Sequence, residues 1–132
     1  MQTIDVVAGV IIKGNRFLAA RRSSRMTWSG FWEFPGGKVE SGESLNQALR
    51  RELEEELSIA ALAFSLWKIK EKKSKEHAIR LFFHLVTEFS GTPTPREGQE
   101  IAWLTLDEAE SFAFLPADEE ILAELPLPRQ AP

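Results

Sequence analysis

The stretch from Gly37 to Ile59, GKVESGESLNQALRRELEEELSI, joins a polar loop to the clearest helical pattern in the sequence. Ser44, followed three residues later by Gln47, forms a capping box, which predicts that a helix begins at Ser44. Apolar residues then recur on one helix face, at Leu45, Ala48, Leu49, Leu53 and Leu57. The stretch therefore predicts an amphipathic helix preceded by an ordered loop.

An acidic run interrupts this apolar face. Glu52, Glu55 and Glu56 are spaced i, i+3 and i+4 and share one side of the helix, whereas Glu54 points about 200° away from Glu52. Glu52 and Glu56 continue the apolar stripe, where a purely structural helix would carry leucine. A charged outer surface is the usual explanation of an acidic run, but carboxylates at this spacing repel one another unless a cation neutralises them. Oxygen ligands and the absence of cysteine favour Mg2+, with Mn2+ as an alternative.

Length and composition indicate one globular domain. A chain of 132 residues with 43% hydrophobic and 27% charged residues is typical of a single domain, which we expect to span residues 1–128 with a frayed tail at 129–132. The net charge of -4 argues against binding to polymeric nucleic acid. Without a signal peptide or a long apolar run, we expect a cytoplasmic protein with no membrane segment. No pattern in the sequence sets an oligomeric state.

The other segments predict strands interleaved with short helices. Strands are expected at 6–12, 16–20, 60–70, 78–88 and 101–104, and an extended aromatic segment at 28–34 that breaks at Pro35-Gly36-Gly37. A charged turn is expected at 71–76 and a loop at 91–99. Short helices with aspartate N-caps are expected at 107–111 and 118–125. This order indicates an α+β fold, a mixed sheet with helices packed against it.

The stretch from Gly37 to Ile59 resembles the Nudix box, whose pattern is Gly-x5-Glu-x7-Arg-Glu-U-x-Glu-Glu-x-Gly-U with U aliphatic. The matching residues are Gly37, Glu43, Arg51, Glu52, Leu53, Glu55, Glu56 and Ile59. Ser58 replaces the second glycine of the pattern, and serine adopts a left-handed helix cap at a cost of about 1 kcal/mol. The resemblance implies the Nudix fold, a mixed sheet sandwiched between helices (α/β/α), and a hydrolase that needs a divalent metal.

The resemblance also implies a role for each matching polar residue. The implied metal ligands are the Gly37 carbonyl and the carboxylates of Glu52, Glu55 and Glu56. Arg51 is expected to pair with Glu43 and so to orient these carboxylates. Glu52 is the first choice for the general base, and Glu97 is the second.

Segments outside the box resemble the MutT branch of the family and its cytidine-preferring relative. They are Arg21-Arg22, Trp32 to Glu40, Arg96 to Gln99 and Leu115 to Asp118. This likeness implies hydrolysis of a nucleoside triphosphate to the monophosphate and pyrophosphate, as in sanitation of the nucleotide pool. It further implies that Glu97 reaches the metal from its loop and that Arg22 and Lys38 meet the phosphates.

Asp118 is the position most informative about the base. The MutT enzymes that clear oxidised guanine nucleotide carry asparagine here, whereas the cytidine-preferring relative carries aspartate. An ionised Asp118 accepts from an amine such as cytosine N4, whereas a protonated one in an apolar pocket can recognise oxidised guanine. Asp118 could equally be a simple helix N-cap. Candidates for the apolar pocket are Phe34, Phe83 and Leu115.

Two other functions remain open at this point. One is hydrolysis of a nucleoside diphosphate linked to a sugar or another group, which uses the same box. The other is a non-catalytic base-recognition module, because the C-terminal domain of adenine-mismatch glycosylases has a similar Trp-x-Phe-Pro-Gly-Gly-Lys stretch. Those domains generally lack the carboxylate set that is present here.

Overall fold

Strand β1 (Gln2–Lys13) lies at the centre of a mixed sheet. In the computed structural model, which describes residues 2–128, seven strands form this sheet in the order β3-β2-β1-β6-β5, with β4 paired to β1 and β7 to β2. The other strands are β2 (Arg16–Arg21), β3 (Trp32–Glu33), β4 (Gly36–Lys38), β5 (Ala60–Lys73), β6 (His77–Ser90) and β7 (Glu100–Leu104). β1 runs parallel to β6 and antiparallel to β2 and β4. The predicted tail, residues 129–132, lies outside the described residues.

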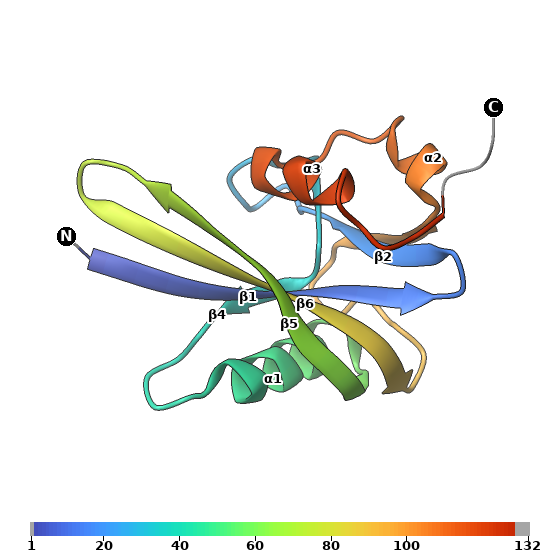
Figure 1. Ribbon diagram of the computed structural model, residues 1–132, viewed down its shortest axis with the longest axis horizontal. Helices are drawn as coiled ribbons and strands as arrows, with labels where there is room; N and C mark the ends of the chain where they lie inside the picture. Colours follow the sequence, from blue (N-terminus) through green and yellow to red (C-terminus); the bar gives the residue numbers. More distant parts are fainter. Residues whose placement is uncertain (1, 129–132) are drawn as a thin grey trace.

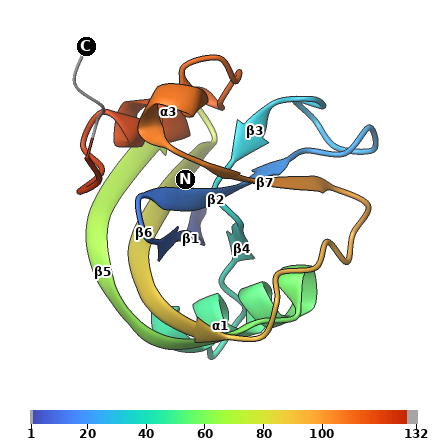
Figure 2. The same cartoon turned by 90° about the vertical axis from the view of Figure 1, so that its right-hand side faces the viewer.

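Helices cover both sides of the sheet. α1 (Leu45–Leu57) lies on one side, and α2 (Leu106–Ala109) and α3 (Pro116–Leu122) lie on the other (Figure 1). Within residues 2–128, apolar side chains form two clusters: one places α1 against β1, and the other places α3 and β2 around Phe34 and Phe83. The long strands β5 and β6 curve from beside α3 to beside α1 (Figure 2). The predicted α+β sandwich is confirmed.

α1 begins and ends where its sequence predicts. Ser44 is the N-cap, and its hydroxyl accepts from the Gln47 backbone N–H while the Gln47 side chain accepts from the Ser44 N–H. Ala48, Leu49, Leu53 and Leu57 are fully buried. Burial of this stripe against the sheet fixes the rotation of the helix and hence the direction of its glutamates.

Three predictions of local structure are wrong. The predicted break at Pro35-Gly36-Gly37 is confined to Phe34-Pro35, because Gly36 and Gly37 form β4, opposite Ala8 and Val7 of β1. A Cβ on Gly36 would collide with the Val7 carbonyl oxygen, so only glycine allows this close approach. Conversely, the segment from Trp28 is turn rather than strand, and only Trp32–Glu33 is extended. The charged turn is shorter than predicted, because β5 continues to Lys73 and β6 begins at His77.

The predicted aspartate N-caps are also wrong. Thr105 caps α2 with a capping box to Glu108, and Leu115 occupies the N-cap position of α3 without a side-chain hydrogen bond. Asp118 lies inside the first turn of α3, where only 7% of it is exposed. Burial rather than capping therefore describes its environment.

Ser58 ends α1 in the left-handed conformation, with φ 57° and ψ 37°, and its N–H donates to the Glu54 carbonyl oxygen at 3.0 Å. Because serine is strained in this region, we expect Ser58→Gly to raise the free energy of unfolding by about 0.5–1 kcal/mol. Chemical denaturation measures the change. Ser65→Gly, an exposed position within β5, is the control and is expected to destabilise. A destabilised Ser58→Gly variant would contradict the assignment of strain.

Candidate active site

A cavity of about 610 Å³ opens between α1, the sheet and α3. Its size is that of a small-ligand site. Glu52, Glu56 and Glu97 line it, and they form what we call the acidic end. Phe34, Leu115 and Asp118 also line it, and they form the apolar end. These six residues come from four separated segments of the chain.

Glu56 is the most deeply buried group of the acidic end. Among the described residues its Oε2 has no hydrogen-bond partner, whereas the backbone N–H of Gly36 donates to its carboxylate. Burial, together with the neighbouring charges of Glu52 and Glu97, raises the pKa of Glu56 to about 9. A buried carboxylate with an unsatisfied oxygen and acidic neighbours fits a cation, which would supply the missing partner.

Arg51 holds the carboxylates around it in place. Its Nε and Nη2 donate to the two oxygens of Glu43 at 2.6 and 2.9 Å, so the predicted pair is present. Its Nη1 donates to Glu52 Oε1 at 2.9 Å. Burial raises the pKa of Glu52, and the Arg51 hydrogen bond partly offsets this. The same guanidinium lowers the pKa of Glu43, so Arg51 keeps one carboxylate ionised while it orients another.

Gly37 lies directly against the carboxylate of Glu52. A Cβ at this position would stand 2.5 Å from Glu52 Cδ, closer than two carbon atoms can approach. The site therefore needs glycine here for space, independently of any role of its carbonyl oxygen. No sequence pattern other than the box glycine itself marks this requirement.

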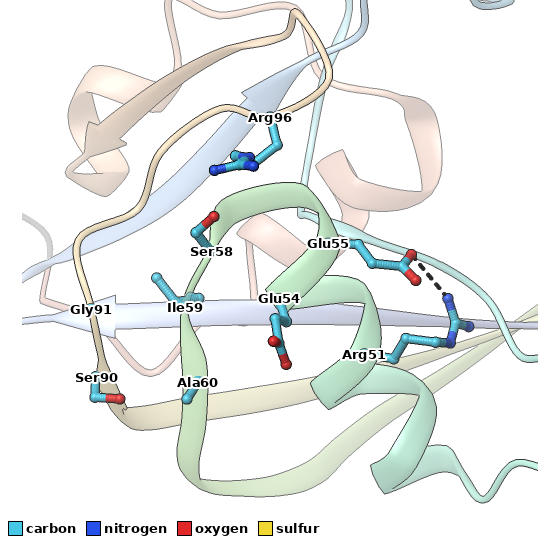
Figure 3. Close-up of a pocket in the computed structure, with 9 residues that line it drawn as sticks. All are labelled: Arg51, Glu54, Glu55, Ser58, Ile59, Ala60, Ser90, Gly91 and Arg96. Carbon is cyan, nitrogen blue, oxygen red and sulfur yellow. Dashed lines mark hydrogen bonds and ion pairs between the residues drawn. The ribbon is translucent and has the colours of Figure 1, made fainter.

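Glu55 is the predicted carboxylate ligand that does not line the cavity. Its side chain is 55% exposed, and its Oε2 accepts from Arg51 Nη1 at 3.2 Å. It borders a shallow groove outside the cavity, together with Glu54, Ser58 and Arg96 (Figure 3). Within residues 2–128, no three acidic or histidine side chains already form a metal-binding cluster. Glu52, Glu56 and Glu97 therefore line the cavity, whereas Glu55 lies outside it and shares Arg51 Nη1 with Glu52.

Asp118 lies at the apolar end, and its carboxyl accepts from the backbone N–H of Phe34. Burial raises the pKa of Asp118 well above its usual value, and the charge of Glu33 adds to this effect. Lys72, which also lines the cavity, acts in the opposite direction. These directions favour a neutral carboxyl that can both donate and accept a hydrogen bond.

The two predicted phosphate-binding cations both line the cavity. Arg22 is already engaged, because its Nη1 donates to Glu33 Oε1 at 2.9 Å and its Nε donates to the Thr27 carbonyl oxygen at 2.7 Å. Lys38 follows Gly37 on β4, next to the acidic end. Lys38 is therefore the better placed of the two for a phosphate group.

Phe83 is the predicted pocket residue that the structure places elsewhere. It is fully buried, it is not among the described residues that line the cavity, and its ring meets the Phe34 ring edge-on at 6.0 Å. Ile79 and Leu81, on the same face of β6, line the cavity instead. Because side chains alternate between the two faces of a strand, Ile79 and Leu81 could have been assigned to the same face as Phe83 from the sequence. Which residues of that face line the cavity depends on the rest of the fold.

Comparison with known proteins agrees with this fold. The model of the NUDIX domain family matches residues 3–125. The chain belongs to the NUDIX family, whose members generally need a divalent metal ion. No helix within residues 2–128 is long and apolar enough to span a membrane.

Two curated relatives and one solved structure illustrate the likeness. The 8-oxo-dGTP diphosphatase of Escherichia coli is 36% identical over 126 residues, covering 95% of this chain and 98% of that protein. The CTP pyrophosphohydrolase of the same organism is 38% identical over 122 residues, covering 92% and 90%. A MutT structure from a study of the Aliivibrio salmonicida and Vibrio cholerae proteins has a TM-score of 0.84 and 35% identity, covering 93% of this chain and 96% of that one.

Proposed function

We propose that this protein hydrolyses a nucleoside triphosphate to the monophosphate and pyrophosphate with Mg2+, and that oxidised guanine nucleotide is its preferred substrate. The observation that carries the proposal is a single cavity with carboxylates at one end and the buried Asp118 at the other. The two ends suit the two parts of a nucleotide, its metal-bound phosphates and its base. The curated relative named as an 8-oxo-dGTP diphosphatase supports this choice.

The residues at the acidic end fit a hard divalent cation. Glu52, Glu56 and Glu97 offer carboxylate oxygens, and the Gly37 carbonyl is the further ligand that we propose. Glu55 is more exposed and does not line the cavity, so we give it a secondary role. Oxygen ligands suit Mg2+, and Mn2+ is also compatible. When bound, such an ion neutralises phosphate charge and acidifies water.

Glu52 is our proposed general base. Its Oε1 accepts from Arg51, which leaves Oε2 to take a proton from the water that attacks phosphorus. The raised pKa of Glu52 makes its carboxylate a better proton acceptor than an exposed one. Glu97 is the second candidate for this role. Lys38, and Arg22 if it exchanges partners, stabilise the phosphate charge during the reaction.

A neutral Asp118 explains why oxidised guanine would be preferred. Its hydroxyl donates and its carbonyl oxygen accepts, so it pairs with an edge that offers an acceptor beside a donor. Oxidised guanine presents O6 as the acceptor and N7–H as the donor, whereas ordinary guanine presents two acceptors. The expected discrimination is therefore between oxidised and ordinary guanine, with Phe34 and Leu115 providing the apolar surroundings.

Cytidine triphosphate is a second candidate substrate. Cytosine also presents an acceptor beside a donor, at N3 and N4, and a relative 38% identical over 92% of the chain is named as a CTP pyrophosphohydrolase. A panel of nucleotides separates the candidates by pyrophosphate release with Mg2+. The panel contains 8-oxo-dGTP, dGTP, CTP, 5-methyl-dCTP and a nucleotide sugar. Release from none of them, with Mg2+ or Mn2+, would refute the proposed function.

The protonation of Asp118 predicts how hydrolysis of 8-oxo-dGTP varies with pH. Because the folded-state pKa of Asp118 is raised, its carboxyl is neutral below that value and loses its donor as the pH rises through it. The lost donor meets O6, an acceptor that oxidised and ordinary guanine share, so a comparison between proteins measures this loss. The kcat/KM of the wild type for 8-oxo-dGTP, divided by that of Asp118→Asn, is expected to fall with rising pH. This quotient cancels ionisations of the catalytic groups, which both proteins share.

Variants at position 118 provide the control. Asp118→Asn keeps a donor and an acceptor at every pH and is therefore the reference that does not titrate at this position. Asp118→Ala is expected to lower the preference for 8-oxo-dGTP over dGTP by about 10- to 100-fold, the effect of one or two lost hydrogen bonds. A quotient that is flat with pH, together with an unchanged preference in Asp118→Ala, would exclude Asp118 from base recognition.

A further inference from the structure

An exposed tryptophan lies at the mouth of the cavity. The loop between β2 and β3 carries Met26 and Trp28, which are 47% and 57% exposed and both line the cavity. This loop lies on the same side of the sheet as α3 in both views of the fold (Figure 2). Trp28 also has φ 57°, in the left-handed region that large side chains rarely adopt. Its exposed position is thus kept in spite of an unfavourable backbone conformation.

Neighbouring groups hold Trp28 in this position. The Phe31 N–H donates to the Trp28 carbonyl oxygen at 3.1 Å, and the Phe31 ring meets the indole edge-on at 5.2 Å. Arg22 Nε donates to the carbonyl oxygen of Thr27, the residue before Trp28. An aromatic side chain held in advance in this way loses little conformational freedom when a ligand binds.

The position of the loop places it near the apolar end of the cavity. The loop lies on the side of the sheet that carries α3 and Asp118, whereas Glu52 and Glu56 belong to α1 on the other side (Figure 1). Arg22, which holds Thr27, also pairs with Glu33, whose charge acts on both Asp118 and Glu56. The acidic end suits metal and phosphates. The base of a nucleotide that spans the cavity therefore lies on the side where Asp118 and Trp28 are found. Indole is a strong stacking surface for any base, because every base has a π-face.

We propose that Trp28 stacks on the nucleobase of the substrate and that the loop between β2 and β3 forms one wall of the base-binding site. This inference rests on the proposed function, since it assumes a nucleotide in the cavity. Asp118 reads the edge of the base, whereas Trp28 covers its face. Stacking contributes affinity for the nucleotide and leaves the reacting phosphates unaffected.

Kinetics of matched variants test the proposal. Trp28→Ala is expected to raise KM for the preferred triphosphate by roughly 5- to 100-fold while kcat changes little. Trp28→Phe is expected to restore most of the affinity, because phenylalanine still stacks. Ile69→Ala is the control, since Ile69 is 54% exposed on β5 and does not line the cavity within the described residues. It should leave KM unchanged.

Tryptophan fluorescence provides a readout that does not need turnover. Titration with 8-oxo-dGMP or CMP, in the presence of Mg2+, is expected to quench the wild-type protein and Trp103→Phe but not Trp28→Phe. Trp103 packs against Phe89 at 6.2 Å, so it is a suitable control. Unchanged KM in Trp28→Ala, or full quenching in Trp28→Phe, would overturn the proposal.

The two readouts separate this proposal from the proposed function. Quenching without hydrolysis of any triphosphate would refute the function and support stacking by Trp28. Hydrolysis without quenching in the wild-type protein would support the function and refute the stacking. The absence of both would refute both, and Trp28 would then be an exposed surface for another kind of partner.

Discussion

Replacement of Glu56 by glutamine is expected to lower kcat by about 1,000-fold while the protein stays folded. Glu56 is the buried carboxylate whose Oε2 lacks a partner among the described residues, and its charge is the part of the acidic end best shielded from water. Loss of a metal-held charge of this kind removes several kcal/mol of stabilisation of the phosphates in the transition state. Pyrophosphate release with saturating Mg2+ measures the effect.

Glu54→Gln is the matched control, because Glu54 belongs to the same helix but borders the groove outside the cavity. Its activity should equal that of the wild type. A Glu56→Gln variant that retains more than a tenth of the wild-type kcat would contradict the assignment of Glu56 to the metal site.

Although Glu56→Gln lowers activity, it should not lower the stability of the metal-free protein. In EDTA, the folded protein holds a proton on Glu56 that the unfolded chain releases, since the folded pKa is about 9 and the usual value is 4.5. Glu56 therefore favours the folded state least at high pH, and stability should fall as the pH rises between these values. Glu56→Gln removes this dependence, so its Tm in EDTA at pH 8 should be at least that of the wild type. Added Mg2+ should raise the Tm of the wild type alone.

Gly37→Ala is expected to lower kcat/KM by about 100-fold with a modest loss of stability. The new methyl group would overlap the carboxylate of Glu52 and push it away from its position between Arg51 and the cavity. A displacement of about 1 Å in a catalytic group is enough for an effect of this size. Kinetics with Mg2+, together with circular dichroism, separate a displaced carboxylate from an unfolded protein.

Two other glycines calibrate this result. Gly9→Ala would place its methyl group 3.4 Å from Leu49 and Leu53, an acceptable contact, and should leave activity close to that of the wild type. Gly36→Ala would collide with the backbone of β1 and should impair folding itself. If Gly37→Ala keeps kcat/KM close to that of the wild type, as expected for Gly9→Ala, then Gly37 does not hold the Glu52 carboxylate in place.

The sequence predicts those parts of the site that depend on local geometry. The capping box at Ser44 and the stripe of buried leucines fix both the start and the rotation of α1, and hence the direction of Glu52 and Glu56. Helical spacing alone also groups Glu55 with them. In the structure Glu55 is 55% exposed and does not line the cavity, although the same Arg51 nitrogen binds both Glu52 and Glu55. Which part of this helix face meets the cavity depends on segments far away in the sequence.

The parts that were missed depend on contacts between distant segments. Asp118 fits an N-cap by local pattern, but α3 begins earlier, at Pro116, and the Asp118 side chain meets the backbone of Phe34. β4 forms because Gly36 and Gly37 can approach β1 closely. In the sequence alone, the same two glycines follow a proline and therefore predict a break. Ile79 and Leu81 join the cavity because β6 lies next to β1.

The parallel pairing of β1 with β6 also has a consequence during translation. β1 leaves the ribosome before its partner, His77–Ser90, so the centre of the sheet cannot close until that distant segment has emerged. Pairing at such a separation is slow because a long loop must be closed first. A nascent chain that stops before β6 already contains every glutamate of the box, yet it lacks the wall formed by Ile79 and Leu81. The cavity is therefore completed only after the box has been synthesised.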